Sequence, residues 1–126
     1  MLERAPTKET TMATTILYPD YPTFTHSYRL VAMEDATEVG HVYVYIIGDP
    51  VKHGKWYALI DDLFVSEAGR GKGYGRTLME AAGTLARKQK CYKIVANSHR
   101  KRKAARALYQ SMGYVPHGRE FRLDLK

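Results

Sequence analysis

The stretch VSEAGRGKGYG, residues 65–75, stands where the pattern of the sequence changes from strand to helix. Glycine lets the backbone turn sharply and lets a ligand come close to main-chain N–H groups. The first N–H groups of a helix have no partner inside it, and the helix dipole favours an anion there. Four glycines at alternate positions, with Arg70, Lys72 and Arg76 among them, therefore predict a phosphate cradle made of backbone. The alternative is that the glycines only shape a loop.

The junction differs from two common phosphate-binding loops. No Gly-Lys-Ser or Gly-Lys-Thr follows at the spacing of a Walker A loop. Gly69, Gly71, Gly73 and Gly75 stand at every second position, unlike the dinucleotide motif G-x-G-x-x-G, and no acidic residue ends the next strand at Asn97. Both assignments are therefore excluded.

Regular patterns on both sides of the junction predict the fold class. Runs rich in Val, Tyr and Ile predict strands, and apolar residues at helical spacing predict two helices. The expected order is β-β-β-α-β-α-β, with strands at 25–33, 39–47, 56–65, 92–96 and 121–125 and helices at 74–85 and 101–112. The first two strands form a hairpin, and the strand at 56–65, apolar on both faces, is typical of a buried central strand. The strand, helix and strand between residues 56 and 96 imply a parallel crossover, so the fold class is α/β (α+β) with a mixed sheet and flanking helices.

Length and composition fit one domain, residues 1–126, in which residues 1–24 are a poorly defined N-terminal extension. Residues 1–15 are polar and expected to be frayed, and prolines interrupt the stretch 18–22. No apolar run reaches the roughly 20 residues of a membrane span, and the N-terminus lacks the apolar stretch of a secretory signal. The single cysteine, Cys91, fits a reducing cytoplasm, where we expect the protein.

The formal net charge of +7 is spread unevenly along the chain. Residues 1–66 hold 5 basic and 9 acidic side chains, whereas residues 67–106 hold 12 basic and 2 acidic ones. A small basic domain suggests nucleic acid or an anionic ligand as a partner. Because the positive part begins at the glycine-rich junction, the distribution favours an anion there and a cation elsewhere.

Three motifs, in the right order, resemble the GNAT superfamily of acyl-CoA N-acetyltransferases. RGKGYG at 70–75 matches the family's pyrophosphate motif Arg/Gln-x-x-Gly-x-Gly/Ala. IDDLFV at 60–65 is similar to its central strand, and LYQSMGY at 108–114 is similar to its Leu-Tyr-x-x-x-Gly-Phe element. Residues 61–114 resemble glucosamine-6-phosphate N-acetyltransferases in particular, and the acidic pair resembles that of polyamine acetyltransferases. The resemblance implies a GNAT-like mixed, mostly antiparallel sheet.

The N-terminal part is shorter than in the family that the chain resembles. Members usually begin with a strand and two helices that form one wall of the acceptor site, but about 24 residues precede the first clear strand here. The resemblance therefore implies either an open acceptor cleft or a wall completed by a second subunit of a homodimer.

The resemblance also assigns roles to residues. The N–H groups from Arg70 through Gly75 hold the pyrophosphate of acetyl-CoA, and main-chain groups of Leu63 and Val65 pair with its pantetheine arm. Tyr109 lies close to the sulfur as general acid. The complete set of expected cofactor-binding residues is Leu63, Phe64, Val65, Arg70, Gly71, Lys72, Gly73, Tyr74, Gly75, Arg76, Asn97, Arg102 and Ala105. In this set Arg102 stands where the family often carries Asn, within a basic run that is expected to contact the phosphates.

The chemistry asks for a base and an acid. A free alkylamine has a pKa of about 10.4, so a base must take its proton. Asp61 or Asp62 is expected to serve, and only one of them should face the cleft because adjacent strand residues point to opposite faces. Tyr109 is expected to protonate the leaving thiolate. The alternatives are Tyr109 as a core residue, the aspartates as sheet-end residues or as ligands of a cationic acceptor, and Asn97, expected near the thioester, as a helix cap.

The sequence thus predicts an acetyl-CoA-dependent N-acetyltransferase that works by direct transfer in a ternary complex, since no Ser, Cys or His is placed as a covalent nucleophile. The acidic first half favours a cationic small-molecule or protein amine as acceptor, whereas the similarity to amino-sugar enzymes favours a phosphorylated amino sugar. Two alternatives are a non-catalytic CoA-binding module and, less favoured, a nucleic-acid binder that uses residues 100–103, which lack interleaved aromatic residues. The five histidines show no ligand spacing, so no metal is expected.

Overall fold

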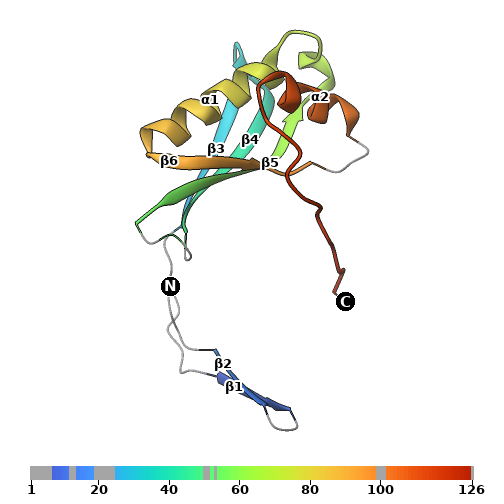
Figure 1. The fold of residues 1–126 in the computed structure, drawn as a ribbon. Helices are drawn as coiled ribbons and strands as arrows, with labels where there is room; N and C mark the ends of the chain where they lie inside the picture. Colours follow the sequence, from blue (N-terminus) through green and yellow to red (C-terminus); the bar gives the residue numbers. More distant parts are fainter. Residues whose placement is uncertain are drawn as a thin grey trace.

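The sheet that carries the candidate site has four strands in the order β3-β4-β5-β6. The structure is a computed structural model that describes residues 7–11, 14–18, 25–49, 52, 54–98 and 102–125. β3 (Thr25–Glu34), β4 (Thr37–Gly48) and β5 (Trp56–Val65) are antiparallel neighbours, and β6 (Cys91–Ala96) runs parallel to β5. The predicted hairpin, crossover and mixed sheet are therefore confirmed (Figure 1).

Both helices pack on the same face of this sheet. α1 (Tyr74–Lys88) connects β5 to β6, and α2 (Lys103–Ser111) lies beside the N-terminal end of α1 (Figure 1). Alternate residues of β4 point toward the helices, so one side of the strand is buried and the other is partly exposed. The buried side chains of the sheet and both helices form one cluster, made of Val42, Val44, Ile46, Ala58, Ile60, Leu63, Leu78, Met79, Ala82, Ala86, Ala105 and Tyr109.

The opposite face of the sheet is not covered by a helix from the described part of the chain. Met33, Phe64 and Val95 are 52%, 44% and 37% exposed on this bare face. The prediction that β5 is buried on both faces is therefore wrong, because the strand is central in the sheet but only its helix side is covered.

Ahead of the main sheet lies a hairpin that the sequence analysis did not predict. β1 (Thr7–Thr11) and β2 (Thr14–Tyr18) pair antiparallel and form a two-stranded sheet of their own. The expected fraying of residues 1–15 is thus wrong for the described positions, since threonine-rich segments favour extended pairing even when they are polar. The proline-rich stretch that follows Tyr18, residues 19–22, lies outside the described residues.

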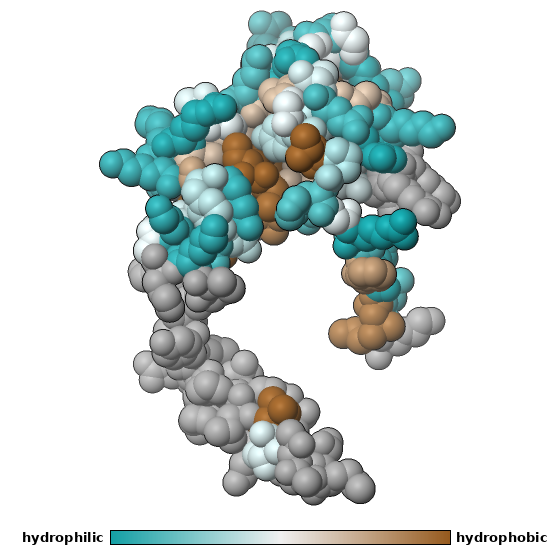
Figure 2. All heavy atoms as spheres, viewed as in Figure 1, coloured by the Kyte–Doolittle hydropathy of each residue, from teal (hydrophilic) through white to brown (hydrophobic). Residues whose placement is uncertain are grey.

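The predicted strand at residues 121–125 is also wrong. These residues belong to no strand, and Phe121, Leu123 and Leu125 are 91%, 82% and 87% exposed. Figure 2 shows the end of the chain standing clear of the rest of the molecule. Alternation shows that a segment can form a strand, but pairing also needs a neighbouring edge, and the C-terminal segment does not reach one here.

Candidate functional site

The glycine-rich junction connects β5 to α1 through a 3-10 turn, η1 (Glu67–Gly69), and two left-handed glycines. Gly71 and Gly73 have φ of 76° and 82°, a conformation that L side chains rarely adopt, and a Cβ added at either would meet nothing within 4 Å. Gly69 is different, because its Cβ would lie 3.0 Å from Cβ of Val39. The last glycines of the loop thus leave open space beside the backbone, as a phosphate cradle requires.

The N-terminus of α1 is left uncapped by side chains. Its N-cap is Gly73, which makes no side-chain cap hydrogen bond, and the first turn contains no acidic residue. The first intrahelical bond runs from the N–H of Thr77 to the carbonyl of Gly73 at 3.1 Å. The N–H groups of the preceding helical residues therefore point out of the helix toward the loop, where the dipole favours an anion.

The basic side chains of the junction brace the loop. Nζ of Lys72 donates to Oε2 of Glu34 at 2.9 Å, and the hydroxyl of Tyr74 donates to the same oxygen at 2.7 Å. Lys72 and then Tyr74 hold the pKa of the Glu34 carboxyl below its usual range. Arg76 donates to Oγ of Ser111 at 2.8 Å, which connects the two helices. These contacts fix the loop against β3 and α2 while its backbone stays exposed.

A β-bulge in β5 carries the acidic pair. Tyr43 faces Asp61, and His41 faces Phe64. Between these two pairs β4 has one residue and β5 has two, so β5 carries one extra residue. Asp62 has φ of 52°, and its N–H donates to Oδ1 of Asp61 at 3.0 Å. The bulge breaks the alternation on which the expectation of a single cleft-facing aspartate was based, and both carboxylates are exposed between buried Ile60 and Leu63.

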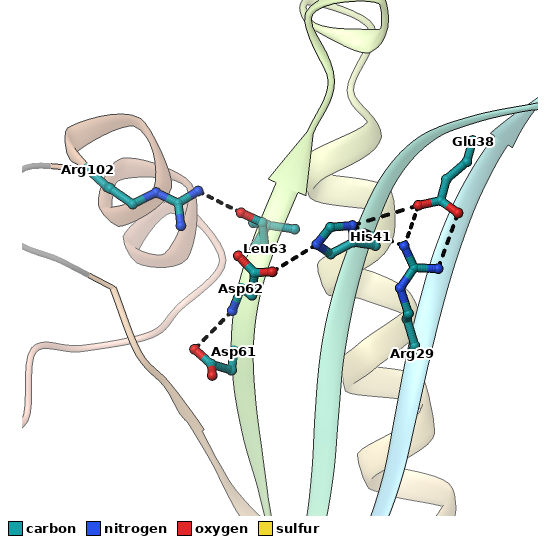
Figure 3. A network of polar contacts seen from close by, with 7 residues as sticks. All are labelled: Arg29, Glu38, His41, Asp61, Asp62, Leu63 and Arg102. Atoms are coloured by element: carbon teal, nitrogen blue, oxygen red, sulfur yellow. Dashed lines mark hydrogen bonds and ion pairs between the residues drawn. The ribbon is translucent and has the colours of Figure 1, made fainter. Parts of the chain in front are cut away.

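Beyond the bulge, β5 continues past the end of β6. The last contact with β6 is the N–H of Asn97, which donates to the carbonyl of Ile60 at 3.1 Å. The carbonyl of Leu63 then accepts from the side chain of Arg102 at 2.6 Å (Figure 3), and the carbonyl of Val65 accepts from Nε of Arg70 at 3.2 Å. On this side β5 therefore offers its polar backbone groups to side chains instead of a neighbouring strand.

Arg102 and Asn97 both differ from one of their expected roles. The N-cap of α2 is Arg102, so Asn97 is not the helix cap that was the alternative reading of it. The side chain of Arg102 reaches the backbone of β5 instead of the glycine-rich loop. Residues 99–101, which complete the basic run, lie outside the described residues.

Tyr109 is held rigidly on α2. It is 6% exposed, and its ring lies against Tyr114 with centroids 5.8 Å apart. After the last helical residue, Ser111, Gly113 has φ of 93°. The N–H groups of Gly113 and Tyr114 donate to the carbonyls of Gln110 and Tyr109 at 3.1 and 3.0 Å. This is a Schellman motif, with Tyr109 and Tyr114 as its apolar contact. Burial raises the pKa of Tyr109, so its hydroxyl stays protonated at neutral pH.

The structure brings most of the predicted residues together. Leu63, Arg102 and Tyr109 meet where β6 ends, and the charges of both Arg102 and Asp61 act on Tyr109. Ala105 is buried on α2, and Gly75 of α1 lies beside Leu108 of α2, so the two helices touch near the start of α1. The side chain of Phe64 lies apart from these groups, beside His41 on the bare face.

His41 lies beside the acidic pair, a position that the sequence analysis did not predict. Its Nε2 lies 3.0 Å from Oδ2 of Asp62, and Arg29 and Glu38 lie on its other side (Figure 3). Sequence alternation places His41 on a strand, but the contact with Asp62 depends on the register of β4 and β5 and on the bulge. Neither of these is visible in a single sequence.

The described residues also bear on metal-dependent and membrane functions. They contain no group of three or more His, Cys, Asp or Glu side chains that would hold a metal ion. In the described part of the chain we also find no helix with the length and apolar character of a membrane span. Burial raises the pKa of the Cys91 thiol, which lowers its reactivity.

Comparisons with known proteins identify the family. The model of the acetyltransferase (GNAT) family matches residues 2–114. Glucosamine 6-phosphate N-acetyltransferase of Trypanosoma brucei brucei is 32% identical over 72 residues, which are 57% of this chain and 47% of that protein. A putative acetyltransferase from Agrobacterium tumefaciens has a similar structure, with a TM-score of 0.69 and 32% identity over 75% of this chain and 66% of the other.

A ribosomal-protein-alanine N-acetyltransferase from Brucella melitensis is similar too, with a TM-score of 0.69 and 25% identity over 79% of this chain and 71% of the other. The chain spans about half the length of the curated relative and about two thirds of the Agrobacterium protein. The matched residues include the glycine-rich junction, the bulged strand and the helix of Tyr109. The chain therefore belongs to the GNAT acetyltransferase family.

Proposed function

We propose that this protein is an acetyl-CoA-dependent N-acetyltransferase that transfers the acetyl group directly to a primary amine in a ternary complex. The observation that carries the proposal is the adjacency of three features: the uncapped start of α1, the side of β5 beyond Ile60 that pairs with no strand, and the mostly buried side chain of Tyr109. Each supplies one requirement of acyl transfer from CoA. The start of α1 binds phosphate, the edge of β5 offers backbone groups to the pantetheine arm, and Tyr109 is a proton donor.

The junction fits the co-substrate on its own geometry. Gly71 and Gly73 leave open space beside their Cα atoms, and the N–H groups at the start of α1 are free of side-chain caps. The carbonyls of Leu63 and Val65 accept hydrogen bonds from arginine side chains, so the same edge can pair with the amide groups of a pantetheine arm. Acetyl-CoA supplies the activated thioester, and the chain supplies binding and orientation.

Tyr109 and the acidic pair divide the proton chemistry. The ammonium group of the acceptor first releases one proton to solvent, and the neutral amine then attacks the thioester carbon, so that the nitrogen becomes acidic as the C–N bond forms. A carboxylate of the bulge accepts the N–H proton, and the hydroxyl of Tyr109 donates a proton to sulfur as the C–S bond breaks. The proton on the carboxylate then returns to Tyr109 through solvent. Because burial raises the pKa of Tyr109, the hydroxyl is in its donor form before each cycle.

The proposed acceptor is a cationic amine that approaches the bare face of the sheet. Asp61 and Asp62 are both exposed there, and the aromatic rings of Tyr43 and Tyr45 stack nearby with centroids 6.5 Å apart. Arg29, on the same face, pairs with Glu38, so its charge is balanced locally. Carboxylates and aromatic faces together favour a cation such as a polyamine, an aminoglycoside or a protein amine.

A second candidate acceptor is a phosphorylated amino sugar. It is favoured by the identity with the trypanosomal glucosamine 6-phosphate enzyme over 72 residues. The bare face weighs against it, because no described helix covers the side from which such an acceptor would be enclosed.

Thiol release from acetyl-CoA, measured against spermidine, an aminoglycoside, a lysine peptide and glucosamine 6-phosphate, tests the proposal. We expect turnover with at least one cationic amine. Highest activity with glucosamine 6-phosphate would support the second acceptor. Binding of acetyl-CoA without turnover on any amine would indicate a non-catalytic CoA-binding module, and the absence of both would overturn the proposal.

A further inference from the structure

His41 is enclosed on the bare face by groups from three strands. On β4 its ring lies 5.5 Å from the ring of Tyr43, and on β5 it lies 5.5 Å from the ring of Phe64, measured between centroids. Its side chain is 17% exposed, whereas that of Asp62 is 59% exposed. The imidazole therefore sits behind the carboxylate and reaches an acceptor only through it.

The partners of His41 fix which nitrogen carries the proton. Nδ1 lies 3.4 Å from a guanidinium nitrogen of Arg29, and guanidinium can only donate. Nδ1 is then an acceptor, so the proton of the neutral ring is on Nε2. Nε2 lies 3.0 Å from Oδ2 of Asp62, a carboxylate that accepts. The tautomer that suits Arg29 is the one that donates to Asp62.

Arg29 is itself fixed by the β3–β4 hairpin. Its two terminal nitrogens pair with the two carboxylate oxygens of Glu38, and its guanidinium carbon lies 5.9 Å from the centre of the Tyr43 ring. Oε2 of Glu38 lies 3.8 Å from Nδ1 of His41. The charged groups that face the imidazole are thus Arg29 from β3, Glu38 from β4 and Asp62 from β5.

The two aspartates of the bulge have different partners. Oδ1 of Asp61 accepts the N–H of Asp62, which stabilises the left-handed turn of the backbone. Oδ2 of Asp62 is held by His41, which leaves Oδ1 of an exposed side chain for a ligand. The Asp61 carboxylate therefore stabilises the local backbone, whereas the Asp62 carboxylate is oriented by His41 of the neighbouring strand β4.

We propose that His41 is a positioning residue that, held by Arg29 and Glu38, presents Asp62 to the acceptor amine, so that Asp62 and not Asp61 accepts the proton. This inference rests on the proposed function. When the amine has attacked, its N–H bond breaks, the proton forms a bond to Oδ1 of Asp62, and the electron pair stays on nitrogen. His41 keeps its own proton and holds Oδ2.

Substitutions at His41 test this role by separating orientation from charge. His41→Leu removes the donor to Asp62, and we expect kcat to fall by about tenfold to hundredfold, the cost of misplacing a reacting group. The KM for acetyl-CoA should stay within about twofold, because the glycine-rich loop is untouched. His41→Gln keeps an N–H donor near Asp62 and should restore most of kcat. His117→Leu, the same substitution at an exposed position outside the sheet, is the matched control and should leave kcat unchanged.

A double-mutant cycle tests whether His41 acts through Asp62. Asp62→Asn should lower kcat by about a hundredfold or more, and adding His41→Leu should lower it little further. Losses that multiply in the double variant would overturn the proposal, and so would an Asp61→Asn variant that loses kcat while Asp62→Asn does not.

Nitrogen NMR of the histidine-labelled protein gives a readout that does not depend on activity. We expect His41 in the Nε2–H tautomer, and a mixture of tautomers in Arg29→Ala. A dominant Nδ1–H tautomer in the wild-type protein would overturn the inference. If the wild-type protein turns over no amine, the proposed function fails and the role of Asp62 fails with it. If the wild-type protein is active and His41→Leu has the same kcat as His117→Leu, the function stands and only this inference fails.

Discussion

Tyr109 combines the two properties that a proton donor to a thiolate needs, a fixed position and a protonated hydroxyl. The Schellman motif at the end of α2 and contact with Tyr114 fix the ring. Burial raises its pKa, with further effects from the charges of Arg102, which lowers it, and Asp61, which raises it. The hydroxyl therefore remains a donor through neutral and mildly alkaline pH.

Tyr109→Phe removes the hydroxyl and keeps the ring in the core. We expect kcat for thiol release to fall by about a hundredfold or more, the usual contribution of a general acid, with the Kd for CoA unchanged. Tyr114→Phe is the matched control, because that ring is the packing partner and its hydroxyl also has a pKa raised by burial. Equal losses in the two variants, or none in either, would contradict the acid role.

At the residue scale, the sequence predicts some members of the site but not the contacts between strands. The family resemblance assigned Tyr109 and Leu63 to one site, and the structure brings their side chains together in the core beside Arg102. The roles of Asp61 and Asp62 depend on a bulge of one residue, and the contact of Asp62 with His41 depends on strand register. Both are long-range properties of the sheet, which the alternation of residues along one strand does not contain.

At the scale of elements, the junction between β5 and α1 depends on backbone conformation more than on side chains. Gly73 is the N-cap of α1 with φ of 82°, and Gly54, in the loop before β5, has φ of 77°. Neither would meet a neighbour within 4 Å if a Cβ were added. The two glycines therefore have the same left-handed backbone and the same open surroundings. They differ because only Gly73 stands at the start of α1.

Gly73→Ala and Gly54→Ala should each lower the free energy of unfolding by about 1 kcal/mol, because both place an L side chain in the left-handed region. Only Gly73→Ala should weaken CoA binding, by about tenfold or more, because its methyl group enters the space over the start of α1. Urea denaturation and calorimetric titration with CoA measure the two effects. Equal Kd values for the two variants would show that the loop does not hold the phosphates.

Sequence periodicity predicted most elements because their burial is periodic. β3 to β6, α1 and α2 all have a face against the common core, and their expected bounds differ from the observed ones by a few residues. The strand expected at 121–125 has the right alternation and no partner, so its apolar residues stay exposed. β1 and β2 pair with each other but show little alternation of apolar residues, so the sequence pattern did not predict this hairpin.

At the scale of the whole molecule, the positive segment of residues 67–106 is not one surface. Arg70, Lys72 and Arg76 lie at the N-terminal end of α1, whereas Arg87 and Lys88 lie in its last turn. The helix has 15 residues and is therefore about 22 Å long, more than twice the Debye length of about 8 Å at physiological salt. These two groups of cations are therefore too far apart to act together, and only the first lies beside the glycine-rich loop.

This division predicts how ligands stabilise the protein. Acetyl-CoA at one hundred times its Kd should add about 2.7 kcal/mol to the free energy of unfolding, a rise in Tm on the order of 10 °C. Raising the salt from about 0.05 to 0.5 M should weaken binding several-fold, because screening acts on the exposed cations near the loop. Arg70→Gln should weaken binding too, whereas Lys88→Gln, at the far end of the helix, should leave the Kd within about twofold.

Short duplex DNA distinguishes this anion site from a nucleic-acid surface. A surface that neutralised many phosphates would bind DNA with a steep salt dependence and would use cations from both ends of α1. With the charge divided, DNA at equal phosphate concentration should give no rise in Tm and should not compete with acetyl-CoA in thermal shift. If DNA raises Tm as much as acetyl-CoA does, and Lys88→Gln reduces that rise as much as Arg70→Gln, then the two groups act as one surface and the assignment of the positive segment to CoA is wrong.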